Sequence, residues 1–201
     1  MKVIIVGASG KIGSRVAERL SGKHEVIRVG SRSGDIICDY TSEPSVAALF
    51  EQAGAADALI VAVGGDSKFK PYPELTDEDY RFGCERKLVA QARLVRFCER
   101  FLNANGSITL TSGFLSHYPN PHSIGTGPFN AAINAFVQHT APLLSKGIRL
   151  NVVSPAPVVE PDQVGKGLVS ADQVAEFYVE AVEGSARGEV FRAWGGLPIP
   201  E

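Results

Sequence analysis

The N-terminal stretch MKVIIVGASGKIGSRVAERL (Met1–Leu20) contains a strand, a glycine loop and a helix in direct succession. Residues Lys2–Val6 are nearly all apolar, which is typical of a parallel strand buried on both faces. The loop GASGKIG (Gly7–Gly13) follows at once and leads into a predicted helix over Ile12–Leu20. Its glycines allow a sharp turn and a close approach of the backbone to a pyrophosphate, which the N–H groups and dipole of the helix would face. The stretch therefore predicts a dinucleotide-binding site.

Two other nucleotide-binding loops can be compared with this one. A P-loop needs four residues between its first glycine and a Gly-Lys-Ser/Thr triplet. Here Gly10-Lys11 follows Gly7 too closely, and Ile12 stands where serine or threonine should be. A methyltransferase loop, which would bind S-adenosylmethionine, fits the same fold class and remains an alternative.

Short apolar runs alternate with helical segments along the whole chain. The runs predict about seven strands, at Lys2–Val6, Glu25–Gly30, Ile36–Cys38, Ala58–Val63, Ser107–Thr111, Arg149–Val153 and Glu189–Ala193. Helices are expected at Ile12–Leu20, from Ser42 as N-cap to Gln52, over Asp77–Leu102 with an irregular start, over Pro128–Ser145, and from a Ser170–Gln173 capping box to Val182. This alternation predicts one Rossmann-type domain over residues 1–201, a doubly wound α/β parallel sheet with helices on both faces.

The composition argues against several classes of protein. The 201 residues carry a formal net charge of -2 without a block of like charges, so no nucleic-acid or anionic-membrane surface is expected. Cys38, Cys84 and Cys98 are odd in number and form no CxxC motif, and the spacing of His117 and His122 matches no zinc pattern. Neither a disulfide framework nor a metal site is therefore expected. With no export signal and no apolar run of roughly 18 residues, a cytoplasmic protein without a membrane span is expected.

The end of the second predicted strand indicates which dinucleotide is preferred. NAD sites place an acidic residue about 20 residues after the glycine loop, where it binds the ribose hydroxyls. Here the segment reads Gly30-Ser31-Arg32-Ser33 and has no acid. Arg32 and the serines suit a 2′-phosphate, and Lys11 adds a further positive charge. NADP is therefore the expected cofactor, with NAD as the second choice.

Several segments, taken in order, resemble the short-chain dehydrogenase/reductase family over nearly the whole chain. They are GASGKIG at Gly7–Gly13, Cys38-Asp39-Tyr40-Thr41, Ile60–Gly64, Ile108–Ser112, Asn130–Phe136, Asn151–Val158 and Trp194-Gly195-Gly196. The resemblance implies oxidoreductase chemistry on a small-molecule substrate. It also implies a set of residues around the dinucleotide, namely Gly7, Ser9, Gly10, Lys11, Ile12, Gly13, Ser31, Arg32, Asp39, Tyr40, Val63, Gly64, Asn130, Pro155 and Val158.

The catalytic positions depart from the family pattern. Family members use a Tyr-x-x-x-Lys pair, in which tyrosine is the acid–base group and lysine lowers its pKa; here Asn130 falls at the lysine and Thr126 at the tyrosine. A threonine hydroxyl is too weak an acid to replace a phenol near neutral pH. Lys87 stands where the family usually has an asparagine, and Ser112 falls on the first of two family serines, with Gly113 on the catalytic one. The chain thus resembles a divergent subgroup with a degenerate active site.

Three residues are candidates for the chemistry: Ser112, Lys87 and Tyr118. Tyr118 lies in the loop Gly113–Ser123, which should cover the nicotinamide end of the site, and Lys87 on the neighbouring helix could lower its pKa. In the alternative interpretation, Tyr118 is an exposed loop residue or lines the pocket.

The expected function is an NADP(H)-dependent oxidoreductase of a small carbonyl or alcohol substrate, with an altered catalytic set. Two alternatives stay open: a non-catalytic NAD(P)-binding sensor or regulatory protein, and methyl transfer. The intact phosphate loop suits both of the dinucleotide hypotheses, whereas the missing tyrosine and lysine favour the sensor.

Apolar stripes run along the predicted helices Glu85–Leu102 and Pro128–Ser145. Most of this surface should face the core, but in the family the matching helices also form a four-helix interface between subunits. A homodimer or homotetramer through these helices is therefore expected. The segment between Pro157 and Ser170, where family members often build a lid over the substrate, is short.

Overall fold

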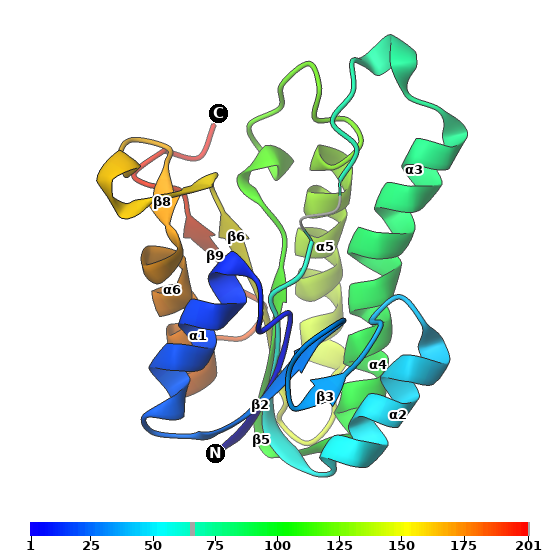
Figure 1. Cartoon of the computed structure of the whole chain (residues 1–201), viewed down its shortest axis with the longest axis vertical. Coiled ribbons are helices and arrows are strands. Elements are labelled where there is room, and N and C mark those ends of the chain that lie inside the picture. The colour runs from blue at the N-terminus through cyan, green and yellow to red at the C-terminus, as the bar shows by residue number, and fades with distance from the viewer. Residues whose placement is uncertain (65–66, 201) are drawn as a thin grey trace.

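The computed structural model describes residues 1–64 and 67–200. A parallel sheet forms the middle layer, and helices cover both of its faces (Figure 1). Helices α1 (Lys11–Ser21) and α6 (Ala171–Glu183) lie on one face. The other face is covered by α2 (Glu43–Ala53), α4 (Ala90–Phe101) and α5 (Gly127–Thr140). This is the Rossmann-type, doubly wound arrangement that the sequence predicts.

Within the described residues, the sheet has seven strands in the order β3-β2-β1-β4-β5-β6-β9, with parallel neighbours throughout. The strands are β1 (Lys2–Val6), β2 (Glu25–Gly30), β3 (Ile36–Ile37), β4 (Ala56–Val61), β5 (Leu102–Thr111), β6 (Arg149–Pro155) and β9 (Val190–Ala193). The strand order reverses between β1 and β4. At such a switch point the connections leave the sheet in opposite directions and open a crevice at the carboxyl ends of the strands.

Shorter elements lie around this crevice and between the helices. The strands β7 (Val158–Val159) and β8 (Val169–Ser170) pair with each other beyond the end of β6. The short helical turns are η1 (Tyr72–Glu74), η3 (Phe114–Ser116), η4 (Ala141–Leu143) and η5 (Pro161–Gln163), all of the 3-10 type. The connections after β4, β5 and β6 rise above the upper end of the sheet in Figure 1.

The apolar strands supply two cores, one on each face of the sheet. In β1, Ile4 and Val6 pack on the side of α2, α4 and α5, whereas Val3 and Ile5 pack on the side of α1 and α6. Because successive side chains of a strand point to opposite faces, a strand covered on both sides is mostly apolar, as β1 is from Val3 to Val6. No helix among the described residues is long and apolar enough to span a bilayer.

The long helix predicted over Asp77–Leu102 is present in three parts. It begins as α3 (Asp77–Gly83), widens into a π-helical turn η2 (Cys84–Val89), and continues as α4 to Phe101. Within the wide turn, the N–H of Ala90 donates to the carbonyl of Glu85, five residues back rather than four. The expected irregularity is therefore a π-helical turn in the middle of the helix, and not an irregular start.

Other predicted boundaries differ at the ends of elements. Strand β4 covers Ala56–Val61 instead of Ala58–Val63, because the chain leaves the sheet for the crevice after Val61. Helix α5 ends at Thr140 rather than Ser145, since Pro142 has no N–H to continue it.

Strand β5 begins at Leu102, and its pairing with β4 shifts register before Ser107, around a left-handed residue at Asn105 with φ of 62°.

Of the two helix caps predicted from the sequence, one forms its hydrogen bonds and the other does not. Ser42 occupies the N-cap of α2 without a capping hydrogen bond. The capping box of Ser170 and Gln173 forms as predicted.

Candidate functional site

The glycine loop connects β1 to α1 at the switch point of the sheet. The N–H of Gly7 donates to the carbonyl of Val29 at 2.8 Å, and the N–H of Gly10 donates to the carbonyl of Gly7 at 3.0 Å, which closes the turn. A Cβ at Gly13 would overlap the carbonyl oxygen of Gly7, so only glycine allows α1 to start this close to the strand. The first turn of α1 carries no acidic residue. The helix therefore presents an N-terminus that suits an anion.

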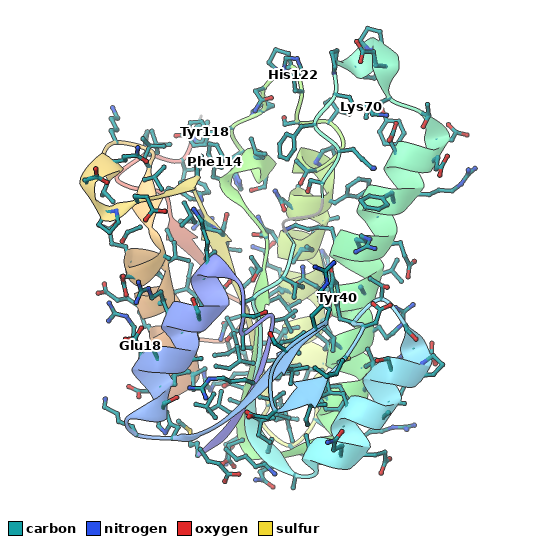
Figure 2. All side chains as sticks on the ribbon, in the orientation of Figure 1. Glu18, Tyr40, Lys70, Phe114, Tyr118 and His122 are labelled. Atoms are coloured by element: carbon teal, nitrogen blue, oxygen red, sulfur yellow. The ribbon has the colours of Figure 1, made fainter. Side chains whose placement is uncertain are left out.

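A cavity of about 330 Å³ lies beside the glycine loop at the ends of β1 and β4. Its wall consists mostly of small residues and backbone: Val6, Gly7, Ser9, Gly10, Gly30, Ser31, Cys38, Tyr40, Ala62, Val63 and Gly64. We call this space the loop cavity. Tyr40, which Figure 2 labels near the ends of β2 and β3, forms part of this wall. Seven residues predicted from the sequence thus meet at one place, namely Gly7, Ser9, Gly10, Ser31, Tyr40, Val63 and Gly64.

The charged residues predicted for the nucleotide lie around the loop cavity and do not line it. Arg32 is exposed in the turn that follows β2. The carboxylate of Asp39 accepts hydrogen bonds from the hydroxyl and the N–H of Thr41, at 2.7 and 2.9 Å, and these bonds lower the pKa of Asp39. The ammonium of Lys11 lies 3.3 Å from the carboxylate of Glu160, in an ion pair that is exposed to solvent.

The remaining predicted phosphate-side residues have different surroundings. Val158 lines a separate cavity of about 210 Å³ together with Lys11 and Glu160, between the start of α1 and the segment after β6. The side chain of Ile12 packs into the core beneath α1. Ile12 therefore has only its backbone N–H to offer to a ligand.

A second cavity of about 420 Å³ continues from the loop cavity, because Gly64 lines both. We call it the polar cavity. Its wall is formed by Gly64, Ser67, Phe69, Lys87, Ser112, Gly113, Phe114, Leu115, Asn120, Thr126, Asn130, Pro155, Ala156 and Pro157. The structure thus brings together Lys87, Ser112, Thr126, Asn130 and Pro155, five residues from four segments that the sequence singled out.

Lys87 lies in the π-helical turn and is only 5% exposed. Its ammonium donates to the carbonyl of Ser112 at 3.1 Å, and burial lowers the pKa of the side chain to about 8. A Cβ at Gly64 would meet the Lys87 ammonium, and the φ of 128° at Gly64 is a conformation that favours glycine. One turn later, Gln91 donates to the carbonyl of Thr111 at 2.8 Å and accepts from the N–H of Thr111 at 3.0 Å, which fixes the helix against the end of β5.

Three other polar side chains of the polar cavity, Ser112, Thr126 and Asn130, are buried. Within the described residues, the hydroxyl of Ser112 and the amide oxygen of Asn130 are buried without a hydrogen-bond partner. The hydroxyl of Thr126 accepts from the hydroxyl of Ser67 at 2.9 Å. Buried polar atoms without partners are unusual in folded proteins, so these two atoms suit a bound polar ligand.

Tyr118 does not take the position that its predicted role requires. Its hydroxyl donates to the carbonyl of Pro198, and its ring packs at 6.0 Å from Phe114 and at 5.7 Å from Trp194, measured between ring centroids. Figure 2 shows Tyr118 beside Phe114, on the side of the molecule where the chain ends. Tyr118 is not among the residues that line the polar cavity, and the pairing of Tyr118 with Lys87 is absent from the described part of the chain.

A larger cavity lies away from this site, on the outer side of α4 and α5. It is an open apolar groove of about 680 Å³, lined by Glu43, Leu88, Val89, Ala92, Arg93, Val95, Arg96, Glu99, Phe136, Thr140 and Leu144. Its wall comes from the two helices that the sequence assigns to a subunit interface. In the described residues, no group of three or more His, Cys, Asp or Glu side chains could hold a metal ion.

Some site residues were not singled out by the sequence. Ser67 and Phe69 come from the connection after β4, which has no regular pattern, and Asn120 comes from the loop Gly113–Ser123, which the sequence placed over the site without distinguishing this residue. Lys68 forms a bridge to Gly125, which joins these two connections above the polar cavity. Such residues meet only because the chain folds over the ends of the strands.

The chain matches a family model described as enoyl-(acyl carrier protein) reductase over residues 1–183. Among curated proteins, it is 32% identical over 162 residues to the hydroxynaphthalene reductase-like protein Arp2 of Metarhizium anisopliae. That match covers 76% of this chain and 60% of the relative, so the chain spans less than two thirds of the length of this curated relative.

Solved structures match over almost the whole chain. The protein lin1944 from Listeria innocua is 37% identical with a TM-score of 0.90, and the match covers 96% of this chain and 100% of that one. A small-chain dehydrogenase in complex with NADPH is 26% identical with a TM-score of 0.88, over 98% of this chain and 97% of that one.

Proposed function

Because the chain belongs to the short-chain dehydrogenase/reductase family, we propose that it is an NADP(H)-binding oxidoreductase that interconverts a small carbonyl compound and the corresponding alcohol. The observation that carries this proposal is the junction of the loop cavity and the polar cavity at Gly64. A ligand bound at the glycine loop can extend through this junction to Lys87 and Ser112. The similar dehydrogenase solved with NADPH supports the same cofactor for this chain.

The residues present fit a phosphorylated dinucleotide. Gly13 keeps the start of α1 close to the strand, and no acidic residue in its first turn repels an anion. Arg32 is exposed in the turn after β2, where an NAD-binding protein would carry an acid for the ribose hydroxyls. A guanidinium pairs well with phosphate, which favours NADP over NAD.

In the proposed reaction, bound NADPH supplies the hydride that a carbonyl carbon needs for reduction. The chain itself holds the substrate and its polar group. Phe69, Phe114 and Leu115 give the polar cavity an apolar wall, and its volume of about 420 Å³ suits a small molecule. The unpartnered hydroxyl of Ser112 is available to donate a hydrogen bond to a carbonyl oxygen.

Titration of the protein with NADPH, NADH and S-adenosylmethionine, followed by nicotinamide or intrinsic fluorescence, tests the binding part of the proposal. We expect NADPH to bind more tightly than NADH, and S-adenosylmethionine not to bind. A screen of aldehydes, ketones and quinones for NADPH consumption then tests the chemistry. Failure to bind either nicotinamide cofactor would refute the proposed function.

A sensor that binds the dinucleotide without turnover is the second candidate. It is favoured by the absence of a phenol from the described wall of the polar cavity and by the engagement of the Tyr118 hydroxyl with Pro198. Tight NADPH binding without consumption across the whole carbonyl screen would support this candidate over the enzyme.

We also propose that the protein forms a homodimer or homotetramer through the apolar groove on α4 and α5. The groove combines exposed apolar side chains such as Val89 with ion pairs at its rim, where Arg93 and Arg96 both lie near Glu43. An apolar centre with a charged rim is typical of a protein interface. A monomer in light scattering at micromolar concentration would refute this proposal.

A further inference from the structure

The polar cavity has one side chain that can exchange a proton near neutral pH. Among its described lining residues, Lys87 alone is titratable; the others are glycine, alanine, proline, phenylalanine, leucine, serine, threonine and asparagine. Hydroxyls and amides neither give up nor accept a proton readily at neutral pH. Among the described lining residues, Lys87 is therefore the side chain that can deliver a proton to a ligand in this cavity.

Among the residues that the structure describes, the neighbours of the Lys87 ammonium are uncharged or have other partners. It is bonded to the Ser112 carbonyl at the end of β5, and Gly64 and Asn130 approach from β4 and α5 without charge. On its own turn, Glu85 pairs with Arg93 at 3.2 Å, and Arg86 lies over the ring of Phe82.

The charged groups of the other neighbouring elements also have partners elsewhere. Asp79 on α3 pairs with Lys70 at 2.8 Å, and Lys68 lies over the ring of Phe82. His139 is at the far end of α5. Burial lowers the pKa of Lys87 to about 8, near the range in which a side chain can exchange a proton with a ligand.

We propose that Lys87 is the proton donor to the substrate carbonyl oxygen, in place of the tyrosine that the sequence lacks. This inference rests on the proposed function, since that reaction supplies the hydride. As the carbonyl carbon gains hydride, the C=O π bond breaks and its electron pair goes to oxygen. The oxygen takes a proton from Lys87, which becomes a neutral amine and regains a proton from water. In alcohol oxidation the neutral amine accepts the proton instead.

The exchange of residues between two packed helices agrees with this role. At the sequence positions discussed above, the family lysine corresponds to Asn130 and a family asparagine corresponds to Lys87. The π-helical turn and α5 pack against each other, and both side chains line the same cavity. The positively charged side chain of this cavity is thus carried by η2, which precedes α4, and α5 contributes the neutral Asn130.

The test compares the wild type with Lys87→Met, Lys87→Gln and the control Lys23→Met, an exposed lysine in the turn after α1. With 9,10-phenanthrenequinone and NADPH as probes, we expect kcat to fall roughly 100-fold or more in both Lys87 variants. The dissociation constant of NADPH should change less than about threefold, and the control should match the wild type. Wild-type kcat for reduction should fall as pH rises through about 8. The kcat of the variants should not show this fall.

A second measurement does not depend on turnover. The protein is labelled with ¹³C at the lysine ε-carbons, and the Lys87 resonance is assigned by its loss in either Lys87 variant. The chemical shift of this resonance should titrate with a midpoint at the pH where wild-type kcat falls. A midpoint near 10, or variants that retain kcat within about threefold, would overturn the role of Lys87 while leaving the proposed function intact. Absence of NADPH binding, or of any quinone or carbonyl reduction by the wild type, would overturn both.

Discussion

Replacing Lys87 by methionine should make the protein more stable at neutral pH, even though it removes a residue of the candidate site. Methionine has a similar length and adapts well to apolar surroundings. Burial lowers the Lys87 pKa from 10.5 to about 8, so folding disfavours the charged amine. A tenfold change in a protonation constant is worth about 1.4 kcal/mol, and the charged lysine therefore costs about 3 kcal/mol of unfolding free energy at pH 7.

The pH dependence gives this prediction its sign. Below pH 8 the amine is protonated in both the folded and the unfolded chain, and the full cost applies. Between pH 8 and 10.5 the folded chain has lost the proton that the unfolded chain still binds, so stability rises with pH. By pH 9.5 the wild type should regain about 2 kcal/mol of the initial cost. The hydrogen bond to Ser112 offsets about 1 kcal/mol, which leaves the variant about 2 kcal/mol more stable at pH 7 and nearly equal at pH 9.5.

Urea unfolding measures these differences. Trp194 is the single tryptophan and is 2% exposed, so its fluorescence reports on loss of the core. Subtracting the unfolding free energy of the variant from that of the wild type at each pH removes the contribution of the groups that the two proteins share. The Lys23→Met control should show no pH-dependent difference, because its side chain is 71% exposed. A difference between wild type and Lys87→Met that is constant from pH 7 to 9.5, or a variant that is less stable at pH 7, would refute the reasoning.

Three further substitutions test the cofactor site and the interface. Gly13→Ala should abolish detectable NADPH binding and lower Tm, because its Cβ would overlap the backbone, whereas Gly22→Ala, where the space is open, should change neither. Arg32→Ala should weaken NADPH binding roughly 10-fold to 100-fold and NADH binding by less than about threefold; equal losses would contradict a contact with the 2′-phosphate. Val89→Glu should convert the oligomer to a monomer in light scattering by placing a charge in the groove, and Ile37→Glu, on the edge strand, should leave it assembled.

The fold could be predicted where local chemistry determines it. The apolar run Lys2–Val6, the glycine loop and the helix after it depend on neighbouring residues only, and the structure contains all three where the sequence places them. The capping box at Ser170 is equally local. The register shift in β5 depends instead on how that strand meets β4, and no signal within residues 102–107 indicates it.

The site could be predicted only in part, because its polar side chains depend on contacts between distant segments. The sequence identified Lys87, Ser112, Thr126 and Asn130, but it paired Lys87 with the wrong partner. Tyr118 is held by Pro198, 80 residues further along the chain, and no spacing rule anticipates that hydrogen bond. The ion pair between Lys11 and Glu160 joins residues 149 positions apart, so the sequence does not indicate it either.

Because of the π-helical turn at Cys84–Val89, the direction in which Lys87 points depends on the number of residues in this helix. One extra residue in a turn rotates the side chains before it by about 100° relative to those after it. Deletion of a single codon there would restore an ordinary helix, leave the apolar face of α4 on the sheet, and swing the preceding residues around the helix axis. Lys87 would then leave the polar cavity although its neighbours kept their identities. An insertion or deletion in this turn could thus move the lysine out of the cavity without changing any residue that lines it.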